Sequence, residues 1–422
     1  MLTSGQRIEL TIEKPAAGGR MIARHDGQVL LVAGGIPGER VSARVERVER
    51  SLAFADAVEI LERSPDRRET SEDPLCGGCL YAHVAYPRQL SLKAEVVADA
   101  FARIGRIALP AVDVAASPER AYRMRARLHA KNGRVGFYRE GTHDLCDAAQ
   151  TGQLTNPALE VAEHAGAVLR ASGQPAISIE LTENLAADQR ALHVELAPGA
   201  RASPALLEAI ASASIVGCTV QDAEGQFWSA RSPVVVDPLE DLTGGRAHGS
   251  LQRHVRSFFQ ANRYLLPKLV STVLEAVPSE SDLLDLYAGV GVFSLTLAGI
   301  GRTRITAVEG DASSGSDLKR NAGQFTDALH PIVDSVETFL SRATHSPSTV
   351  IVDPPRTGIS KEAMPNLLRL NASRVIYVSC DPPTMARDVA KLMAGGYRLS
   401  SLRAFDLFPN TPHVECVGVL DR

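Results

Sequence analysis

The sequence predicts a mixed α/β protein, with a Rossmann-like parallel-sheet domain at its C-terminal end, preceded by an OB-like β-barrel and a central α+β region. At about 150 residues per domain, 422 residues suffice for two or three domains. Short alternating strands punctuated by glycines open the chain, which is typical of a small barrel. Near-continuous apolar strands alternating with helices close it, and they indicate a parallel sheet covered on both faces.

The composition, 45% hydrophobic and 22% charged, is that of an ordinary globular protein. A net charge of -4 gives no overall preference for nucleic acid, so any polyanion site must be a local patch. No apolar run is long enough to span a bilayer, and Arg7 and Glu9 stand where a signal peptide would be apolar. We therefore expect a cytoplasmic protein that makes no membrane contact and acts as a monomer.

Residues 1–65 are predicted to form the barrel. Polar and apolar residues alternate from Arg7, and further strands are expected over 25–45 and from Ala55. Barrels of about five strands commonly bind oligonucleotides, although a barrel that only caps the structure would show the same pattern. The charged segment 66–74, which ends in proline, is predicted to be a linker.

Residues 75–256 are predicted to form the α+β region. This region opens with the CGGC motif of Cys76–Cys79 and continues with a predicted helix over 86–107. Segments that start at Ile177 and Ala191 alternate with period two around a polar connection, which indicates a hairpin.

A basic segment lies inside this region. From Arg120 to Arg139 the chain carries six arginines and Lys131 and no acidic residue, interleaved with aromatic side chains. Such a segment is typical of a surface that binds the RNA backbone, although a solvated surface strand can be equally basic. The candidate phosphate contacts are Arg123, Arg125 and Arg127.

In residues 257–422, four apolar strands end in chemically different side chains: Tyr287, Glu309, Asp353 and Cys380. Ligands of parallel α/β sheets sit at the carboxyl ends of the strands. This edge of the sheet is therefore the predicted active site.

The first of these strands leads into a glycine turn. In DLYAGVGVFS (Asp285–Ser294), Gly289 and Gly291 have no side chain, so a ligand can approach the backbone closely there. Glu309 closes the next strand, from where a carboxylate can accept both ribose hydroxyls of a nucleoside. A third glycine and a phosphate-binding lysine are missing, which favours a cofactor without phosphates, such as S-adenosylmethionine. The alternative is a tight turn beside an unrelated surface glutamate.

Three further positions can carry chemistry. Two prolines stiffen the loop after Asp353 and hold this carboxylate and Arg356 in place to bind a base edge, unless the loop is only a strand exit. Cys380 at its strand end is either a nucleophile facing the cleft or an inert core thiol. Glu415 starts an apolar strand, where burial of a carboxylate is costly unless it has a role; a solvated strand end is the alternative.

Together these segments resemble the uracil-5 RNA methyltransferase family, which uses S-adenosylmethionine to make 5-methyluridine in ribosomal and transfer RNA. The N-terminal part is similar to a TRAM domain through GGRMIARHDGQVLLVAGGIPGERV, and the middle matches through CGGC and YRMRARLHAKNGRVGFY. The C-terminal part carries FFQAN, DLYAGVGVFSL, VDPPRTG, YVSCDPPTMARD and FPNTPHVE. The last three motifs in this order are highly specific, and the resemblance covers nearly the whole chain.

The resemblance implies a covalent mechanism. Cys380 would add to C6 of uracil and thereby make C5 a nucleophile toward the methyl group. Glu415 would then remove the C5 proton so that the thiolate can leave. By the same matching, the cofactor and base pocket would be lined by Gln260, Tyr287, Glu309 and Asp353, with Arg356 steadying the enolate or the base edge.

The cysteine pattern departs from that of the iron-sulfur members of the family, because Thr70 occupies the position of a ligand cysteine. Cys76, Cys79 and Cys146 would leave a four-iron cluster one thiolate short, and a fourth ligand such as Asp73 or His83 would be harder than thiolate. Zinc would also need a histidine, and the second close pair of a zinc ribbon is missing. We expect an iron-sulfur cluster that is absent or labile, and the alternative is that the cysteines only pack.

Two other functions fit parts of the sequence. An RNA cytosine-5 methyltransferase also adds a cysteine to C6, but such enzymes usually place the nucleophile after proline, and here Ser379 precedes Cys380. A noncatalytic RNA-binding protein would keep the barrel and the sheet but would not need Cys380, Glu415 and Asp353 together. The TRAM-like part favours ribosomal over transfer RNA by family analogy alone.

Overall fold

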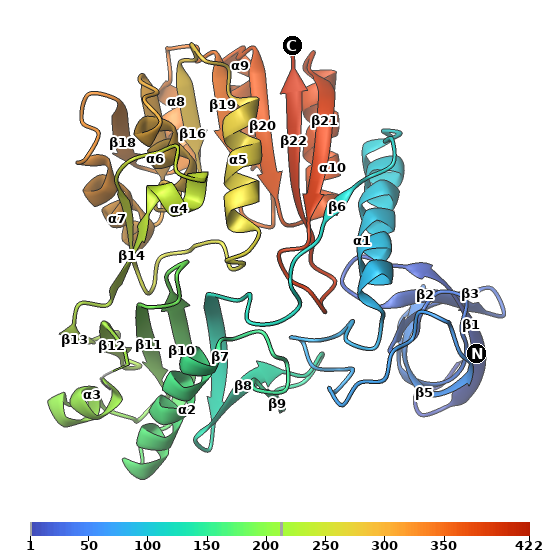
Figure 1. Ribbon diagram of the computed structural model, residues 1–422. Coiled ribbons are helices and arrows are strands. Elements are labelled where there is room, and N and C mark those ends of the chain that lie inside the picture. The colour runs from blue at the N-terminus through green and yellow to red at the C-terminus, as the bar shows by residue number, and fades with distance from the viewer. Residues whose placement is uncertain (1, 212–213) are drawn as a thin grey trace.

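The structure is a computed structural model that describes residues 2–211 and 214–422. Figure 1 shows three bodies: a β-barrel at lower right, a central sheet with two helices at lower left, and a large sheet covered by helices above both. Within the described ranges, no helix has the length and hydropathy to cross a membrane.

The N-terminal strands close into a five-stranded barrel in the order β1-β2-β3-β5-β4, which confirms the predicted barrel. Alternate side chains such as Leu10, Leu30 and Val41 point inward and are buried. The strands are β1 (Arg7–Pro15), β2 (Met21–His25), β3 (Gln28–Ala33), β4 (Arg40–Val48) and β5 (Leu52–Glu62).

The central region is a seven-stranded sheet in the order β13-β12-β11-β10-β7-β8-β9. Helices α2 (Asn156–Ala171) and α3 (Pro204–Ile210) cover one face, where Leu128, Ile179 and Val194 join their core. The antiparallel pair β10 and β11 confirms the predicted hairpin. The strands are β7 (Arg125–Lys131), β8 (Arg134–Tyr138), β9 (Leu145–Asp147), β10 (Ala176–Glu183), β11 (Arg190–Leu196), β12 (Gly217–Gln221) and β13 (Phe227–Arg231).

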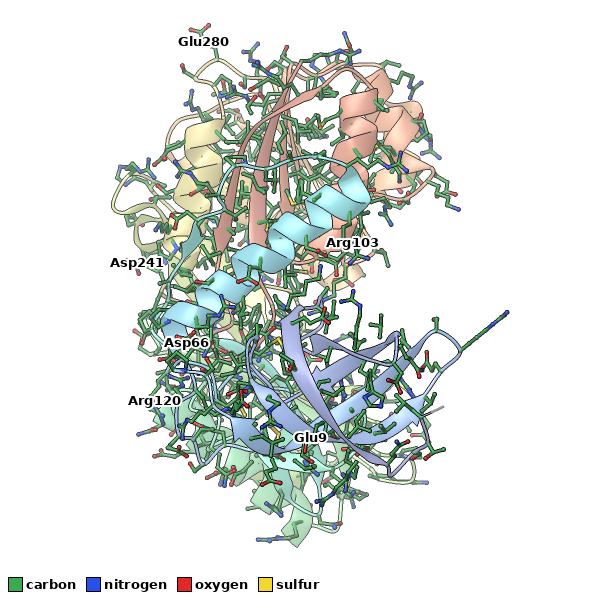
Figure 2. The ribbon with its side chains drawn as sticks, turned by 90° about the vertical axis from the view of Figure 1, so that its right-hand side faces the viewer. Glu9, Asp66, Arg103, Arg120, Asp241 and Glu280 are labelled. Atoms are coloured by element: carbon green, nitrogen blue, oxygen red, sulfur yellow. A yellow bond between two sulfur atoms is a disulfide. The ribbon has the colours of Figure 1, made fainter. Side chains whose placement is uncertain are left out.

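The helix predicted over 86–107 is α1 (Tyr86–Ala100), continued by one π-helical turn, η1 (Phe101–Gly105). Figure 2 shows α1 lying across the junction between the barrel and the large sheet. Leu92 of α1 packs into the barrel core, whereas Val97 belongs to the core under the large sheet. Because one helix is shared by two cores, it fixes the barrel against the large sheet.

The large sheet has the order β18-β17-β16-β19-β20-β22-β21-β6. Strands β16 to β20 are parallel, as predicted, but β22 runs antiparallel between β20 and β21, because a loop too short for a crossover reverses the chain after β21. The strands are β6 (Val114–Ala115), β16 (Leu283–Leu286), β17 (Ile305–Glu309), β18 (Leu329–Val333), β19 (Thr349–Val352), β20 (Arg374–Ser379), β21 (Arg398–Phe405) and β22 (Glu415–Asp421).

Helices cover both faces of this sheet. One core contains apolar residues of α5 (Leu266–Ala276), α6 (Val292–Gly299) and α7 (Ala312–Ala322). The core on the opposite face contains residues of α1 and of three further helices: α8 (Val336–Arg342), α9 (Ala363–Arg369) and α10 (Pro382–Ala394). This double cover explains why the sheet strands read as continuous apolar runs.

The segment 234–254 joins the two sheets. It forms a two-stranded ribbon of β14 (Val234–Pro238) and β15 (Ser250–His254), with the short α4 (Leu239–Thr243) between them. The backbone N–H of Gln252 donates to Asn321 Oδ1 at 3.0 Å. The ribbon therefore packs against α7, which covers the large sheet. The C-terminal domain thus includes residues that precede its predicted start at residue 257.

Candidate active site

A cleft of about 1050 Å³ opens at the carboxyl ends of the parallel strands. One wall comes from the large sheet and the loop before β22, and the other from β7 and β8 of the central sheet. The structure brings all six predicted catalytic and cofactor residues into this cleft: Gln260, Tyr287, Glu309, Asp353, Cys380 and Glu415.

Cys380 and Glu415 face each other across two strand ends. Ser379 pairs with Cys416 in the antiparallel ladder of β20 and β22, so the next step of the ladder sets Cys380 opposite Glu415. Directly opposed residues have Cβ atoms about 5 Å apart. The nucleophile and base expected from the sequence are therefore direct neighbours.

Burial raises the pKa of both groups. Burial raises the pKa of Cys380 to about 11, helped by the charge of Glu415, while Arg356 acts to lower it. Glu415 is only 4% exposed, and burial followed by the charge of Asp353 raises the pKa of Glu415 well above that of an ordinary carboxyl. Both groups thus favour their neutral forms in the protein alone, and Arg356 is the positive charge that opposes this.

The turn after β16 presents bare backbone to the cleft. Tyr287 has φ of +60°, a left-handed conformation that is uncommon for a bulky residue and is often found at functional sites. At Gly289, with φ of +58°, an added Cβ would meet nothing within 4 Å, whereas at Gly291 it would meet Leu318 at 2.8 Å. Gly289 therefore leaves open space for a ligand, while Gly291 allows close packing.

Glu309 is held in position by two backbone amides. Its Oε2 accepts from the N–H of Gly289 at 2.8 Å, and its Oε1 accepts from the N–H of Asp311 at 2.6 Å. Each carboxylate oxygen can accept a further hydrogen bond. The Glu309 carboxylate therefore lies fixed in the cleft wall with acceptor capacity left for a ligand.

Two more carboxyl groups lie at this side of the sheet: Asp353 lines the cleft, whereas Asp285 lies inside β16 behind it. Asp285 is fully buried, and Ser294 of α6 opposes the effect of this burial on its pKa. Burial raises the pKa of Asp285 to about 7 and that of Asp353 also to about 7, and the charge of Asp285 adds to the shift of Asp353. Gln260 Nε2 donates to Asp353 Oδ2 at 3.4 Å.

This donor set fits S-adenosylmethionine. The cofactor carries a sulfonium and an ammonium group, and a nearby cation stabilises the ionised form of a carboxyl group whose pKa is raised by burial. The glycine turn, Glu309 and Asp353 would bind its ribose and its positive charges, and Asp285 behind them would add negative charge without lining the cleft. Asp285 belongs to the glycine motif but was not predicted as a site residue; the sequence signal for it is a carboxylate inside an apolar strand.

Arg123, the first candidate of the basic segment, is enclosed rather than free. Its guanidinium lies 5.1 Å from the ring centroid of Phe137 and 5.4 Å from that of Phe408, and it donates to Gln153 Oε1 at 2.7 Å. Arg123 lines the cleft and does not stand on the outer surface where the RNA backbone contact was expected.

Arg125 and Arg127 form ion pairs on the surface of the central sheet. Arg125 lies 3.1 Å from Glu180, and Arg127, with its side chain 51% exposed, lies 2.6 Å from Glu195. The sequence could not show these partners, because they stand more than 50 residues away on β10 and β11. The positive charge of the segment is therefore partly neutralised.

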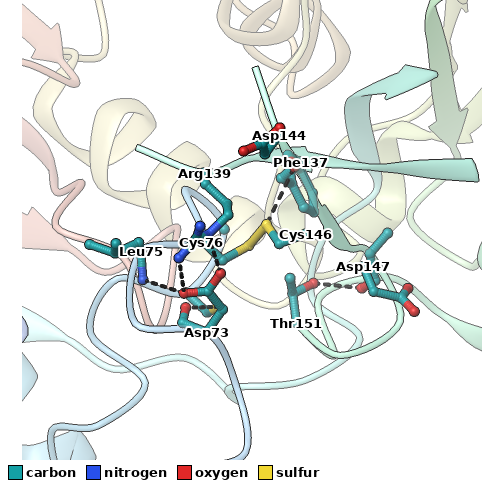
Figure 3. Close-up of a disulfide and its surroundings, with 12 residues drawn as sticks. Asp73, Leu75, Cys76, Phe137, Arg139, Asp144, Cys146, Asp147 and Thr151 are labelled. Carbon is teal, nitrogen blue, oxygen red and sulfur yellow. Dashed lines mark hydrogen bonds and ion pairs between the residues drawn. A yellow bond between two sulfur atoms is a disulfide. The ribbon is translucent and has the colours of Figure 1, made fainter. Parts of the chain in front are cut away.

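The three cysteines considered as metal ligands do lie together, but not as three thiolates. Figure 3 shows Cys76 and Cys146 joined in a disulfide, near an ion pair between Asp73 and Arg139. Cys79 keeps its thiol, and burial raises its pKa to about 12. Over residues 2–211 and 214–422, no group of three or more histidine, cysteine or carboxylate side chains is placed to hold a metal ion.

This arrangement does not fit a four-iron cluster. Such a cluster normally takes four thiolates, and here two of the three sulfurs are bonded to each other. The proposed fourth ligands are engaged as well: Asp73 pairs with Arg139, and His83 Nε2 lies 3.3 Å from the carbonyl of Gly35. We derive no catalytic step through iron.

The sheet has a glycine turn after one strand, a glutamate fixed by backbone amides after the next and a carboxylate-lined cleft at the same edge, an arrangement that fits the class of S-adenosylmethionine-dependent methyltransferases. Residues 244–422 match the model of the tRNA (uracil-5-)-methyltransferase family, and residues 2–58 match the TRAM domain.

The chain is 31% identical to 23S rRNA (uracil(1939)-C(5))-methyltransferase RlmD of Pseudomonas putida, over 99% of this chain and 94% of that protein. It is also 31% identical to an uncharacterized RNA methyltransferase of Streptomyces coelicolor, over 99% and 93% of the two chains. The protein therefore belongs to the RNA uracil-5 methyltransferase family, whose members use S-adenosylmethionine.

The fold agrees with a solved structure. The tRNA (uracil-54, C5)-methyltransferase of Pyrococcus abyssi, in complex with S-adenosyl-L-homocysteine, superposes with a TM-score of 0.77 at 24% identity. The match covers 97% of this chain and 99% of the other. The mixed α/β architecture is thus shared along the whole chain.

Proposed function

We propose that this enzyme methylates C5 of one uridine in 23S ribosomal RNA through a transient bond between Cys380 and C6 of the base. The observation that carries the proposal is the opposition of Cys380 and Glu415 at the ends of β20 and β22, inside a cleft suited to a cationic cofactor. The choice of ribosomal RNA rests on relatives such as the Pseudomonas putida protein, whose name specifies that substrate.

The reaction needs three events at this pair. The Cys380 sulfur adds to C6 as a thiolate, and the electrons of the C5–C6 bond move onto C5 and O4 as an enolate. S-adenosylmethionine supplies an electrophilic methyl group when bound. C5 takes that methyl group, Glu415 as carboxylate removes the remaining C5 proton, and the returning electron pair expels the thiolate. Arg356 faces this pair and would stabilise the enolate charge.

The three parts of the chain would share the work. Residues 257–422 carry the chemistry, while residues 75–256 and the barrel of residues 1–65 hold the RNA. A base within a stacked or paired RNA must first be flipped out, which costs a few kcal/mol, and contacts to these outer parts would offset that cost. We propose that the enzyme works as a monomer in the cytoplasm on newly made RNA.

The first test replaces the proposed nucleophile. Cys380→Ala should abolish methyl transfer while cofactor binding is nearly unchanged, and RNA with 5-fluorouridine at the target should become covalently attached to the wild-type enzyme only. The control is Cys218→Ala, which removes another buried free thiol, on β12. Substantial turnover by the Cys380 variant would refute the covalent mechanism.

The second test identifies the substrate. Mapping of 5-methyluridine in total RNA from cells with and without the gene should show one site lost from 23S ribosomal RNA. Loss from transfer RNA instead would correct the substrate, and loss of 5-methylcytidine would correct the reaction.

A further inference from the structure

One face of the central sheet is not covered by its own helices. Leu128, Ile179 and Val194 point toward α2 and α3. Neighbouring residues along a strand point to opposite faces, so His129 and Glu195 point to the other side. This second face, which we call the open face, borders the cleft, because His129 is one of the residues that line it.

Aromatic rings mark both ends of one row across the open face. In register, His129 pairs with Ser178, Ser178 with Glu195, Glu195 with Gln221, and Gln221 with Phe227. Four strand spacings of nearly 5 Å put His129 and Phe227 about 19 Å apart. The two aromatic ends thus stand on one side of the sheet, at a distance that a few extended nucleotides can span.

Each end is a stacked pair. The His129 ring lies parallel to that of Tyr138, with centroids 3.5 Å apart and planes within 8°, and both residues line the cleft. At the other end, Phe227 lies at 21° to the ring of His193, with centroids 6.0 Å apart. Such flat surfaces accept nucleobases of any sequence, because every base has a π-face.

Arg256 connects the second pair to the cleft. Its guanidinium lies 4.3 Å from the ring centroid of Phe227, and Arg256 also lines the cleft. Unlike Arg125 and Arg127, it has no carboxylate within ion-pair distance among the described residues. A planar cation stacked on an exposed ring is a common contact for single-stranded RNA.

The middle of the row carries little net charge. Glu195 is paired with Arg127 and accepts from Ser178 Oγ at 3.0 Å. At the end of the row, Phe227 is 45% exposed on the edge strand β13. The exposed ring of Phe227, with the Arg256 guanidinium held over it, therefore offers a flat surface on which a base can stack.

We propose that Phe227 and Arg256 form a stacking site for an unpaired base of the RNA strand that leads out of the cleft from the target uridine. This inference deepens the function proposed above and rests on it for the identity of the RNA. The sheet would thereby hold flanking nucleotides at a point beyond the reacting base, in the way that exposed sheet aromatics stack bases in other RNA-binding folds.

The test measures the affinity of the full-length protein for a 23S ribosomal RNA fragment with unpaired nucleotides around the target. Phe227→Ala should weaken binding roughly 5- to 100-fold with an unchanged dependence on salt, because a stacking contact and no phosphate contact is lost. Phe227→Trp should restore affinity. Arg256→Lys, which keeps the charge but not the plane, should also weaken binding without changing the salt slope.

Two controls separate this site from general effects. Ile104→Ala removes an equally exposed apolar side chain from η1, away from the cleft, and should bind RNA like the wild type. A fragment whose flanking nucleotides are base-paired should bind the wild type and Phe227→Ala equally, because its bases are not free to stack. Thermal unfolding of each variant shows whether the fold is intact.

The outcomes distinguish this inference from the proposed function. If the wild type makes 5-methyluridine in this fragment but Phe227→Ala binds it within twofold of wild type, the stacking site is wrong and the function stands. If the wild type does not methylate the fragment, the proposed substrate is wrong, whereas the affinities of the Phe227 variants still decide whether the site binds single-stranded RNA.

Discussion

Gln89 and Asn410 form a reciprocal pair of hydrogen bonds. Gln89 Nε2 donates to Asn410 Oδ1 at 2.8 Å, and the backbone N–H of Asn410 donates to Gln89 Oε1 at 2.9 Å. Asn410 has φ of +64° in the loop that leads to Glu415. Helix α1 therefore fixes the loop of the proposed base from outside the catalytic domain.

Other distant residues hold the same loop. The carbonyl of Leu407 accepts from Asn262 at 3.0 Å, that of Phe408 from Lys93 at 3.1 Å, and that of Asn410 from the N–H of Tyr81 at 2.8 Å. Lys93 also forms a fully buried ion pair with Asp406. These contacts make the loop a rigid support, which a base aligned with the C5 proton requires.

Gln89→Leu tests this support. The change leaves two buried groups of Asn410 without one of their partners, so we expect a loss of about 1–3 kcal/mol in the free energy of unfolding. We also expect at least a tenfold slower release of methylated RNA, because Glu415 loses its alignment. Urea unfolding and single-turnover kinetics measure the two effects, and an unaltered release rate despite lower stability would show that the loop does not position Glu415.

Glu415→Gln should separate methyl transfer from product release. Addition of Cys380 and methylation need no base at C5, whereas expulsion of the thiolate does, so a methylated protein-RNA adduct should accumulate with ordinary uridine. Denaturing gels detect this adduct. Full turnover by the variant, or failure before any adduct forms, would assign the base elsewhere.

Asp285 should make the cofactor-free protein less stable as the pH rises. Because burial raises its pKa to about 7, the folded protein holds a proton that the unfolded chain releases near pH 4. Stability is therefore lost between about pH 4 and 7, by up to about 4 kcal/mol for this group alone.

Asp285→Asn should remove this loss and be more stable than the wild type at pH 8, yet bind S-adenosylmethionine at least tenfold more weakly. Denaturant unfolding at pH 5 and pH 8, together with calorimetric titration of the cofactor, checks both effects. Equal stability at the two pH values in the wild type would contradict the assignment.

The joint replacement of Arg123, Arg125 and Arg127 by alanine should weaken RNA binding but lower the salt slope by only about 1. Each phosphate contact contributes roughly that amount, and in the structure only Arg127 is well exposed, while Arg125 is ion-paired and Arg123 is enclosed by rings. A slope reduced by about 3 would show that the ion pairs break on binding, and an unchanged slope would point to another surface.

Protein purified without oxygen should hold well under four iron atoms per chain and show little of the broad visible absorption of iron-sulfur clusters. After purification in air, alkylation of the denatured protein without a reductant should label four cysteines, namely Cys79, Cys218, Cys380 and Cys416, because three of these thiols are buried in the folded protein. Close to four irons, lost on Cys79→Ser, would instead establish a cluster completed by a ligand other than cysteine.

Local patterns were enough to predict the parts of the site that lie on single strands or turns. Tyr287, Glu309, Asp353 and Cys380 each end an apolar strand, and parallel strands bring such ends to one edge whatever the rest of the chain does. The same reasoning predicted the barrel, because alternation and glycine turns are local consequences of strand geometry.

Pairings between distant segments were decided only by the tertiary structure. The basic segment looked unpaired, but sheet register places Glu180 and Glu195 beside Arg125 and Arg127. The same register sets Phe227 in one row with His129, almost 100 residues earlier in the chain.

Two further features also depend on contacts between distant segments. One is the disulfide between Cys76 and Cys146, and the other is the support that Gln89 and Lys93 give to the loop before Glu415. The sequence alone was enough to predict the family and the place of the candidate site, because strand ends and turns are specified by a few neighbouring residues. Long-range packing decided which charges remain free, which thiols are paired and what supports the loop of the proposed base Glu415. These contacts depend on the register and the docking of elements that are far apart in the chain.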